Sequence, residues 1–141
     1  MFIKLRPATL KDAEDLLKWK NDDTMRKYTI ADNAIIKMED HLKWLYRHID
    51  RIYIIENMAG ESMGDIRFED DEMALKIDPR FRGKGVGVAA LTEAKRMFDH
   101  LIGNVVNGNV ASMRLFTKAG FKIIDYKEKN DTGYYVFEYK A

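Results

Sequence analysis

Residues 77–88 have the sequence Ile-Asp-Pro-Arg-Phe-Arg-Gly-Lys-Gly-Val-Gly-Val, and the rest of the chain is organised around them. Residues 73–78 place the large apolar side chains Met73, Leu75 and Ile77 at alternate positions, which predicts a strand that ends at Pro79. Three glycines at alternate positions follow among basic side chains, and a helical pattern begins after them. Glycine lets a ligand approach the main chain closely, and a helix start offers unpaired N–H groups. The stretch therefore predicts an anion site, most naturally for a phosphate or pyrophosphate.

Two other phosphate motifs and a plain charged turn are the alternatives. A P-loop requires Ser or Thr after Gly-Lys, but Gly85 follows Lys84. Residues 85–90 fit the loose dinucleotide pattern, yet no well-placed acidic residue ends a following strand. A surface turn explains the charge but not three glycines in five residues beside three basic side chains.

The composition indicates one globular domain over residues 1–141. Its 46% hydrophobic and 33% charged residues are ordinary for such a domain, and the length allows a sizeable core. A net charge of +1 gives no electrostatic reason to expect a nucleic acid or a membrane surface as partner. The absence of cysteine excludes a thiol nucleophile, and three histidines without ligand spacing make a metal site unexpected. No apolar run approaches transmembrane length and residues 1–6 are too short for a signal peptide, so we expect a cytoplasmic protein.

Hydrophobic periodicity predicts alternating groups of helices and strands. The predicted strands are residues 2–6, 53–55, 63–68, 72–78, 105–106, 121–129 and 134–140. The predicted helices are residues 13–20 after a Thr9–Asp12 capping box, a short helix to 28, residues 38–49, a helix from the glycine loop to about 99, and residues 111–119. Residues 29–37 should form a loop, and the strand at Val105 and Val106 should be short.

A second motif joins the glycine stretch. Arg82-x-x-Gly85-x-Gly87 resembles the pyrophosphate loop of the GNAT superfamily, the acetyl-CoA-dependent N-acetyltransferases. The second resemblance, to the family pattern N-x-x-S-x-x-L-[YF]-x-K-x-G-F, comprises Asn109, Ser112, Leu115, Phe116, Lys118, Gly120 and Phe121. The resemblance covers most of the chain and implies a single GNAT fold of the α/β (α+β) class. That fold has a mixed, largely antiparallel seven-stranded sheet, flanking helices, and strands four and five that splay apart.

The resemblance also implies where acetyl-CoA binds. Its pantetheine arm would pair with the backbone of Lys76 and Ile77 at the edge of strand four. The remaining implied cofactor contacts are Arg82, Gly83, Lys84, Gly85, Val86, Gly87, Asn109, Ser112, Phe116 and Lys118. Asn109 also suits a turn in Asn-Gly-Asn, so both explanations remain open. Replacing Gly85 or Gly87 by Val should block the pyrophosphate while leaving the fold intact.

Acetylation of an amine requires a neutral nucleophile. With a pKa near 10.4, about one alkyl amine in 2,500 is neutral at pH 7, a handicap of roughly 4.6 kcal/mol. Glu72 is the first candidate base because many relatives carry Glu at the start of this strand, although a solvated turn residue is the alternative. His41 is the second, with a plain helix-surface histidine as its alternative. Phe116 occupies the position of the tyrosine that the family often uses as proton donor, so the general acid stays open.

The N-terminal third should shape the acceptor site. Its W-[RK]-N and E-x-H-x-x-W patterns resemble those of acetyltransferases for nucleotide-linked amino sugars. The candidate acceptor-binding residues are Trp19, Asn21, Arg26, Trp44 and Arg67. Tryptophan faces suit a sugar or base, and arginines suit a diphosphate. The alternative is that the tryptophans lie in the core and the cations on the solvated surface.

We therefore expect direct acetyl transfer from acetyl-CoA to a primary amine, with a nucleotide-linked amino sugar as the first acceptor considered. Protein N-termini and polyamines are the alternative acceptors. A CoA-binding module without catalysis is the alternative of another class, suggested by Phe116. The sequence leaves the oligomeric state open, with a homodimer as one option.

Overall fold

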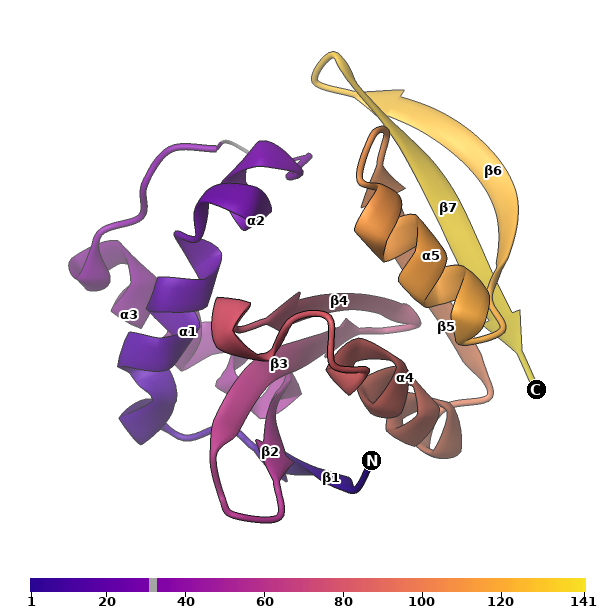
Figure 1. The fold of residues 1–141 in the computed structure, drawn as a ribbon. Coiled ribbons are helices and arrows are strands. Elements are labelled where there is room, and N and C mark those ends of the chain that lie inside the picture. Colours follow the sequence, from indigo (N-terminus) through magenta and orange to yellow (C-terminus); the bar gives the residue numbers. More distant parts are fainter. Residues whose placement is uncertain (31–32) are drawn as a thin grey trace.

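One mixed sheet organises the fold. A computed structural model describes residues 1–30 and 33–141, in which seven strands have the order β1-β2-β3-β4-β5-β7-β6 (Figure 1). The strands are β1 (Ile3–Pro7), β2 (Ile52–Asn57), β3 (Ser62–Glu69), β4 (Glu72–Ile77), β5 (His100–Val106), β6 (Lys122–Lys129) and β7 (Thr132–Lys140). The helices are α1 (Ala13–Lys20), α2 (Asp23–Lys27), α3 (Met38–His48), α4 (Val86–Met97) and α5 (Val110–Lys118), with short 3-10 turns η1 (Leu10–Asp12), η2 (Ile49–Arg51) and η3 (Pro79–Phe81). The predicted fold class is confirmed.

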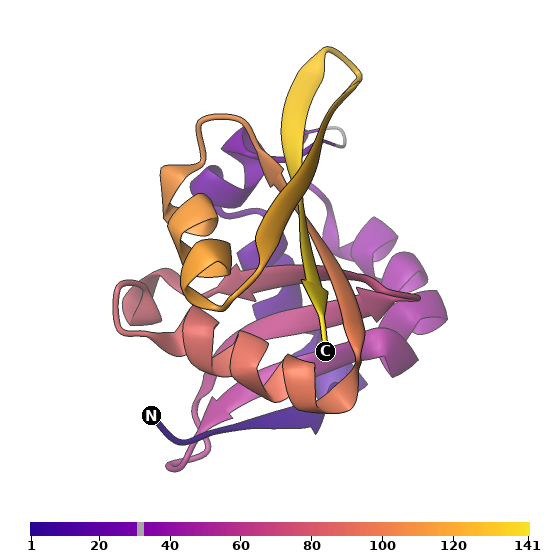
Figure 2. The same ribbon diagram turned by 90° about the vertical axis from the view of Figure 1, so that its right-hand side faces the viewer.

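The sheet divides between β4 and β5. Every other neighbouring pair of strands is antiparallel, but these two are parallel and share only the pairs Glu72–Ile102 and Met73–Gly103. Beyond Met73 the two strands diverge, as Figure 2 shows from the side of β5 and β7. The predicted splay of strands four and five is therefore present, and it leaves one edge of β4 without a strand partner over residues 74–77.

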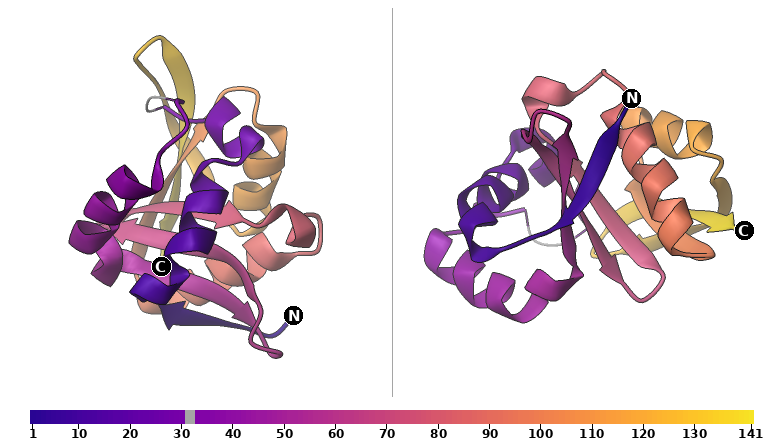
Figure 3. Two further views of the ribbon diagram at one scale, coloured as in Figure 1. Left: turned by 90° about the vertical axis from the view of Figure 1, so that its left-hand side faces the viewer. Right: turned by 90° about the horizontal axis from the view of Figure 1, so that it is seen from below.

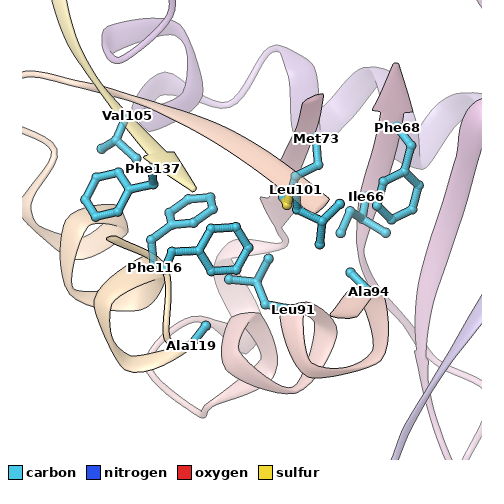
Figure 4. Close-up of a cluster of buried hydrophobic side chains, with 11 residues drawn as sticks. Ile66, Phe68, Met73, Leu91, Ala94, Leu101, Val105, Phe116, Ala119 and Phe137 are labelled. Carbon is cyan, nitrogen blue, oxygen red and sulfur yellow. The ribbon is translucent and has the colours of Figure 1, made fainter. Parts of the chain in front are cut away.

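Helices cover both faces of the first half of the sheet. In Figure 3, α1 and α3 lie on one side of the sheet and α4 lies on the other. Alternation along β2 explains how one strand serves both layers, because Ile54 packs with Trp19 and Leu45 while Ile55 packs with Val86. The largest core cluster lies between the sheet, α4 and α5, and it is shown in Figure 4.

The predicted element boundaries are close to those observed, with one marked exception. The Thr9 N–H donates to Asp12 Oδ2 (2.8 Å), and Asp22 Oδ2 caps α2 by accepting from the Met25 N–H (3.3 Å), as the turn residues indicate. Residues 31 and 32 of the expected loop 29–37 lie outside the described residues.

No helix in the described ranges has both the length and the apolar character needed to cross a bilayer.

The exception is β5, which runs for seven residues rather than the two that were expected. Gly103 interrupts the apolar pattern of this strand, but it is paired with Phe137 of β7. A side chain at Gly103 would overlap the ring of Phe116, so glycine is required here by packing. The strand is therefore defined by its neighbours and not by its own hydrophobic pattern.

Candidate active site

The splay between β4 and β5 opens into a cleft of about 1100 Å³. Its wall is continuous from the glycine loop and α5, along β4, to α1, α2 and α3. We call the first part the loop end and the second part the helix end. The loop end includes Arg82, Gly83, Gly85, Val86, Gly87, Asn109, Ser112, Phe116 and Lys118. The helix end includes Lys20, Arg26, His41, Trp44 and Arg67, and Glu72, Lys76 and Ile77 of β4 lie between the two.

The turn after β4 is held by a buried carboxylate. Asp78 is 1% exposed, and its Oδ2 accepts a hydrogen bond from Trp19 Nε1 (3.0 Å). Its Oδ1 accepts from the Arg80 N–H (2.9 Å) and from Arg80 Nε (3.1 Å). These donors hold the pKa of Asp78 well below its usual range, although burial opposes them. The interaction fixes the start of the glycine loop against α1.

The three glycines differ in what a side chain would meet, and Gly83, with φ +72°, shares the left-handed backbone conformation of Gly85. Gly85 has φ +83° and is the N-cap of α4, so a side chain there would strain the backbone. Gly87 lies inside α4, and a Cβ would come 2.8 Å from Leu115 Cδ1 of α5. Gly87→Val would therefore require the Leu115 side chain to shift, and the expectation that this variant keeps the fold stays a prediction.

Arg82 connects the loop end to both β4 and α2. Its Nε donates to the Ile77 carbonyl (3.1 Å), and its Nη2 donates to Asp22 Oδ2 (2.8 Å). Lys84 belongs to the same loop but does not line the cleft. The loop end therefore combines a fixed guanidinium, glycine backbone and the first turn of α4, which suits a pyrophosphate.

On the α5 side of the loop end, residues that line the cleft also stabilise the fold. Asn109 caps α5, since its Oδ1 accepts from the Ser112 N–H (3.3 Å). Phe116 lines the cleft but is 6% exposed, and its ring lies 5.1 Å from that of Phe121 and 5.4 Å from that of Phe137 (Figure 4). A phenyl ring has no proton to donate, so Phe116 contributes packing only.

At the helix end, His41 is buried rather than on the helix surface. It is 1% exposed, and its Nε2 lies 3.1 Å from the Ala13 carbonyl oxygen. A carbonyl can only accept, so Nε2 carries the proton and Nδ1 presents a lone pair. Nδ1 lies 3.5 Å from Lys20 Nζ. Burial, followed by the charge of Lys20, lowers the pKa of His41.

Lys20 is the residue at this end that sequence reasoning missed as a site residue. Its Nζ lies 3.0 Å from the centroid of the Trp44 ring, and Arg67 lies 5.1 Å from the same centroid. Burial, with Lys76 and Arg67 nearby, lowers the pKa of Lys20 to about 7. The signal was available, because Lys20 is the central residue of the W-[RK]-N pattern.

The remaining candidate residues differ in whether they line the cleft. Trp19 is 1% exposed and does not line the cleft, so its proposed contact with an acceptor is not supported. Asn21 also lies off the cleft, and its amide exchanges two hydrogen bonds with the backbone of Ile36 (2.9 and 2.8 Å). Arg26 lines the cleft, and its Nε donates to the Asn33 carbonyl (2.9 Å). Glu72 is exposed and lies at the closed end of the splay.

The fold and cleft are those of an acetyltransferase, and a family model agrees. Residues 3–122 match the model described as the acetyltransferase (GNAT) domain, so the chain belongs to the GNAT acetyltransferases. Enzymes of this family take the acetyl group from acetyl-CoA.

Individual relatives differ in the acceptor that their names give. The chain is 29% identical over 134 residues to YwnH of Bacillus subtilis (strain 168), provisionally named as a phosphinothricin acetyltransferase, covering 83% of this chain and 82% of that protein. It is 26% identical over 136 residues to the peptidyl-lysine N-acetyltransferase YjaB of Escherichia coli (strain K12), covering 94% and 91%. Its fold is similar to that of the spermidine N-acetyltransferase of Vibrio cholerae, solved with CoA and spermine, with a TM-score of 0.85, 14% identity, and 98% and 95% coverage.

Proposed function

We propose that this acetyltransferase acts on a primary amine whose molecule also carries an anionic group, and that a nucleotide-linked amino sugar is its acceptor. The observation that supports this most directly is the group of cationic side chains Lys20, Arg67 and Lys76 that line this part of the cleft. Burial, followed by the charges of Lys76 and Arg67, lowers the pKa of Lys20, and the charge of Asp65 opposes them. An anion beside Lys20 would relieve that repulsion.

The loop end and β4 would hold acetyl-CoA. The edge of β4 without a strand partner, around Lys76 and Ile77, would offer backbone groups to the pantetheine arm, apart from the Ile77 carbonyl that accepts from Arg82 Nε. Arg82, Gly83, Gly85 and the start of α4 would bind the pyrophosphate. In this arrangement the thioester lies between the two ends of the cleft, beside the acceptor.

Glu72 would act as the base. It is a cleft-lining carboxylate at the closed end of the splay, on the same strand as the cofactor-binding edge. It would take a proton from the ammonium group of the acceptor, and the neutral amine then attacks the thioester carbonyl. The absence of cysteine rules out an acyl-thioester on the enzyme and agrees with direct transfer. Phe116 cannot protonate the departing thiolate, whose moderate pKa makes that step less demanding.

An amino acid with an anionic side group is the second acceptor class. It is favoured by the relative YwnH, since phosphinothricin contains an amine, a carboxylate and a phosphinate. The positive potential at Lys20 is unfavourable for a polyamine.

A thiol-release assay tests the proposal with four acceptors at matched concentration. They are a nucleotide-linked 4-amino sugar, phosphinothricin, spermidine, and a peptide with a free N-terminus. We expect turnover of the sugar nucleotide, and next of phosphinothricin. Turnover of only spermidine or the peptide would reject the anionic acceptor. Binding of acetyl-CoA with no acceleration by any amine would instead favour the CoA-binding module.

A further inference from the structure

Lys20 has an unusual position for a lysine. Its side chain lines the helix end of the cleft, and among the described residues no carboxylate oxygen lies within 4 Å of its Nζ. The neighbouring Lys76, by contrast, has Asp65 Oδ1 at 3.4 Å from its Nζ. Lys20 is half-buried, and its Nζ faces the cleft against the Trp44 ring without a carboxylate partner, so its position requires an explanation.

The structure pairs this amine with a base. Lys20 Nζ lies 3.5 Å from His41 Nδ1, the ring nitrogen that carries a lone pair because Nε2 donates to the Ala13 carbonyl. A nucleophile within reach of a base that is oriented by a third group is the usual arrangement for an activated side chain. Here the three groups are the lysine amine, the imidazole and the backbone carbonyl.

The surroundings lower the pKa of the amine, so that a large share of it is neutral at pH 7. The charged groups that face Lys20 are Lys76 of β4 and Arg67 and Asp65 of β3, while α3 contributes the neutral His41 and the Trp44 ring. The two cations and burial lower the lysine pKa, and Asp65 opposes them. With a pKa of about 7, about half of the Lys20 side chains are neutral at pH 7, against about one in 2,500 for an ordinary lysine.

We propose that Lys20 is a self-acetylation site, modified by acetyl-CoA bound in the same cleft when no acceptor is present. The Nζ lone pair forms a bond to the thioester carbonyl carbon, and the carbon–sulfur bond breaks. His41 Nδ1 takes the proton that Nζ loses, and the CoA thiolate is later protonated by solvent. The products are Nε-acetyl-lysine and CoA. The inference depends on the proposed function only in placing acetyl-CoA in this cleft.

The modification would change the helix end permanently, because an amide does not hydrolyse readily. The acetylated side chain has no charge, so an anionic acceptor would lose one of its partners. A bound anionic acceptor would in turn protect Lys20, because it favours the protonated and therefore non-nucleophilic amine. The extent of self-acetylation would thus depend on how often acetyl-CoA occupies the cleft without an acceptor.

The test is site-resolved mass spectrometry of the full chain incubated with acetyl-CoA at pH 7 without any acceptor. Lys43 is the control, since it lies on α3 with 73% of its side chain exposed. We expect Lys20 to be acetylated at least about tenfold faster than Lys43, because a greater neutral fraction outweighs its lower basicity. Excess CoA, which competes for the cleft, should slow modification of Lys20 but not of Lys43.

Equal rates at the two lysines, or modification of Lys20 that excess CoA leaves unchanged, would overturn the proposal. His41→Asn should slow acetylation of Lys20 without affecting Lys43, and the CoA competition provides the test if that variant fails to fold. The acceptor panel is independent of this result. Turnover of amines without modification of Lys20 rejects only the self-acetylation, and modification without turnover of any amine rejects only the proposed acceptor chemistry.

Discussion

The buried contact between Trp19 and Asp78 should hold the cofactor loop in place, and it can be measured by a double-mutant cycle. Trp19→Phe keeps an aromatic ring in the core but removes the Nε1–H that donates to Asp78 Oδ2 at 3.0 Å. Asp78→Ala removes the acceptor. The two single variants and the double variant isolate the energy of this one contact from the effects of packing.

The expected magnitude follows from burial. A hydrogen bond to a charged group contributes about 1.5–3 kcal/mol, and both partners here are 1% exposed. The smaller ring adds about 1 kcal/mol for the cavity that it leaves. We therefore expect Trp19→Phe to reduce the free energy of unfolding by about 2.5–4 kcal/mol, and the cycle to give a coupling of about 1.5–3 kcal/mol. This loss is tolerable for a domain of ordinary stability.

Urea unfolding followed by far-UV circular dichroism measures the four free energies, because it does not depend on the tryptophan that is replaced. Since the folded pKa of Asp78 is lowered, its stabilising effect is present above the unfolded pKa near 3.8 and is lost as the pH falls below it. The difference between the wild type and Trp19→Phe should therefore shrink in acid. A coupling below about 0.5 kcal/mol at neutral pH would refute the reasoning.

Three further variants test the loop, the base and a surface ion pair. Gly85→Val should weaken acetyl-CoA binding as measured by calorimetry. The control is Gly60→Val, which has a similar φ of +81° but lies in a turn that does not line the cleft, so it should lose similar stability and still bind acetyl-CoA normally. Equal affinities of the two variants would contradict the assignment of the loop to the cofactor. Glu72→Gln should lower turnover at least about tenfold and flatten its pH dependence without changing acetyl-CoA affinity, and normal turnover would mean that Glu72 is only a turn residue. Glu138 raises the pKa of His100, so the stabilisation from this pair is complete below about pH 6.5 and is lost as the pH rises through the raised value. The melting temperature of His100→Gln should thus differ from the wild type more at pH 6 than at pH 9, and a constant difference would contradict the assignment.

Much of this fold could be predicted from residues that are close together in the sequence, and the rest depends on long-range contacts. The glycine loop, the helix caps and the final hairpin depend on residues within a few positions of one another, and each was predicted near its observed place. His41 could not be assigned to the core in this way. Its apolar neighbours suggested that Leu42 faces inward, yet Leu42 is 42% exposed, and the polar partner that His41 needs is the Ala13 carbonyl, 28 residues away.

The same distinction between local and long-range contacts applies to the site. Most of the residues that the sequence patterns singled out do line the cleft, because the loop and α5 motifs are contiguous. They left Trp19 open between the acceptor site and the core, and the core alternative holds; its partner Asp78 is 59 residues distant, so no local pattern identifies it. They also passed over Lys20, whose pKa is lowered by burial and then by the charges of Lys76 and Arg67 on neighbouring strands. A single residue's pKa depends on tertiary neighbours that periodicity does not identify.

The division of the sheet has a consequence for self-association. An unpaired strand edge is a template for another chain, so proteins must protect it. The outer edge strand β6 is exposed along its whole length, with a register shift between Ile123 and Asp125 and lysines at both ends, features that discourage such pairing. The free edge of β4 needs none of these features, because β5 diverges from it within the same sheet and the helix and loop ends enclose the opening. A narrow, flexible ligand arm can therefore reach backbone groups along this edge, whereas the edge of a second protein molecule is too broad to enter the opening.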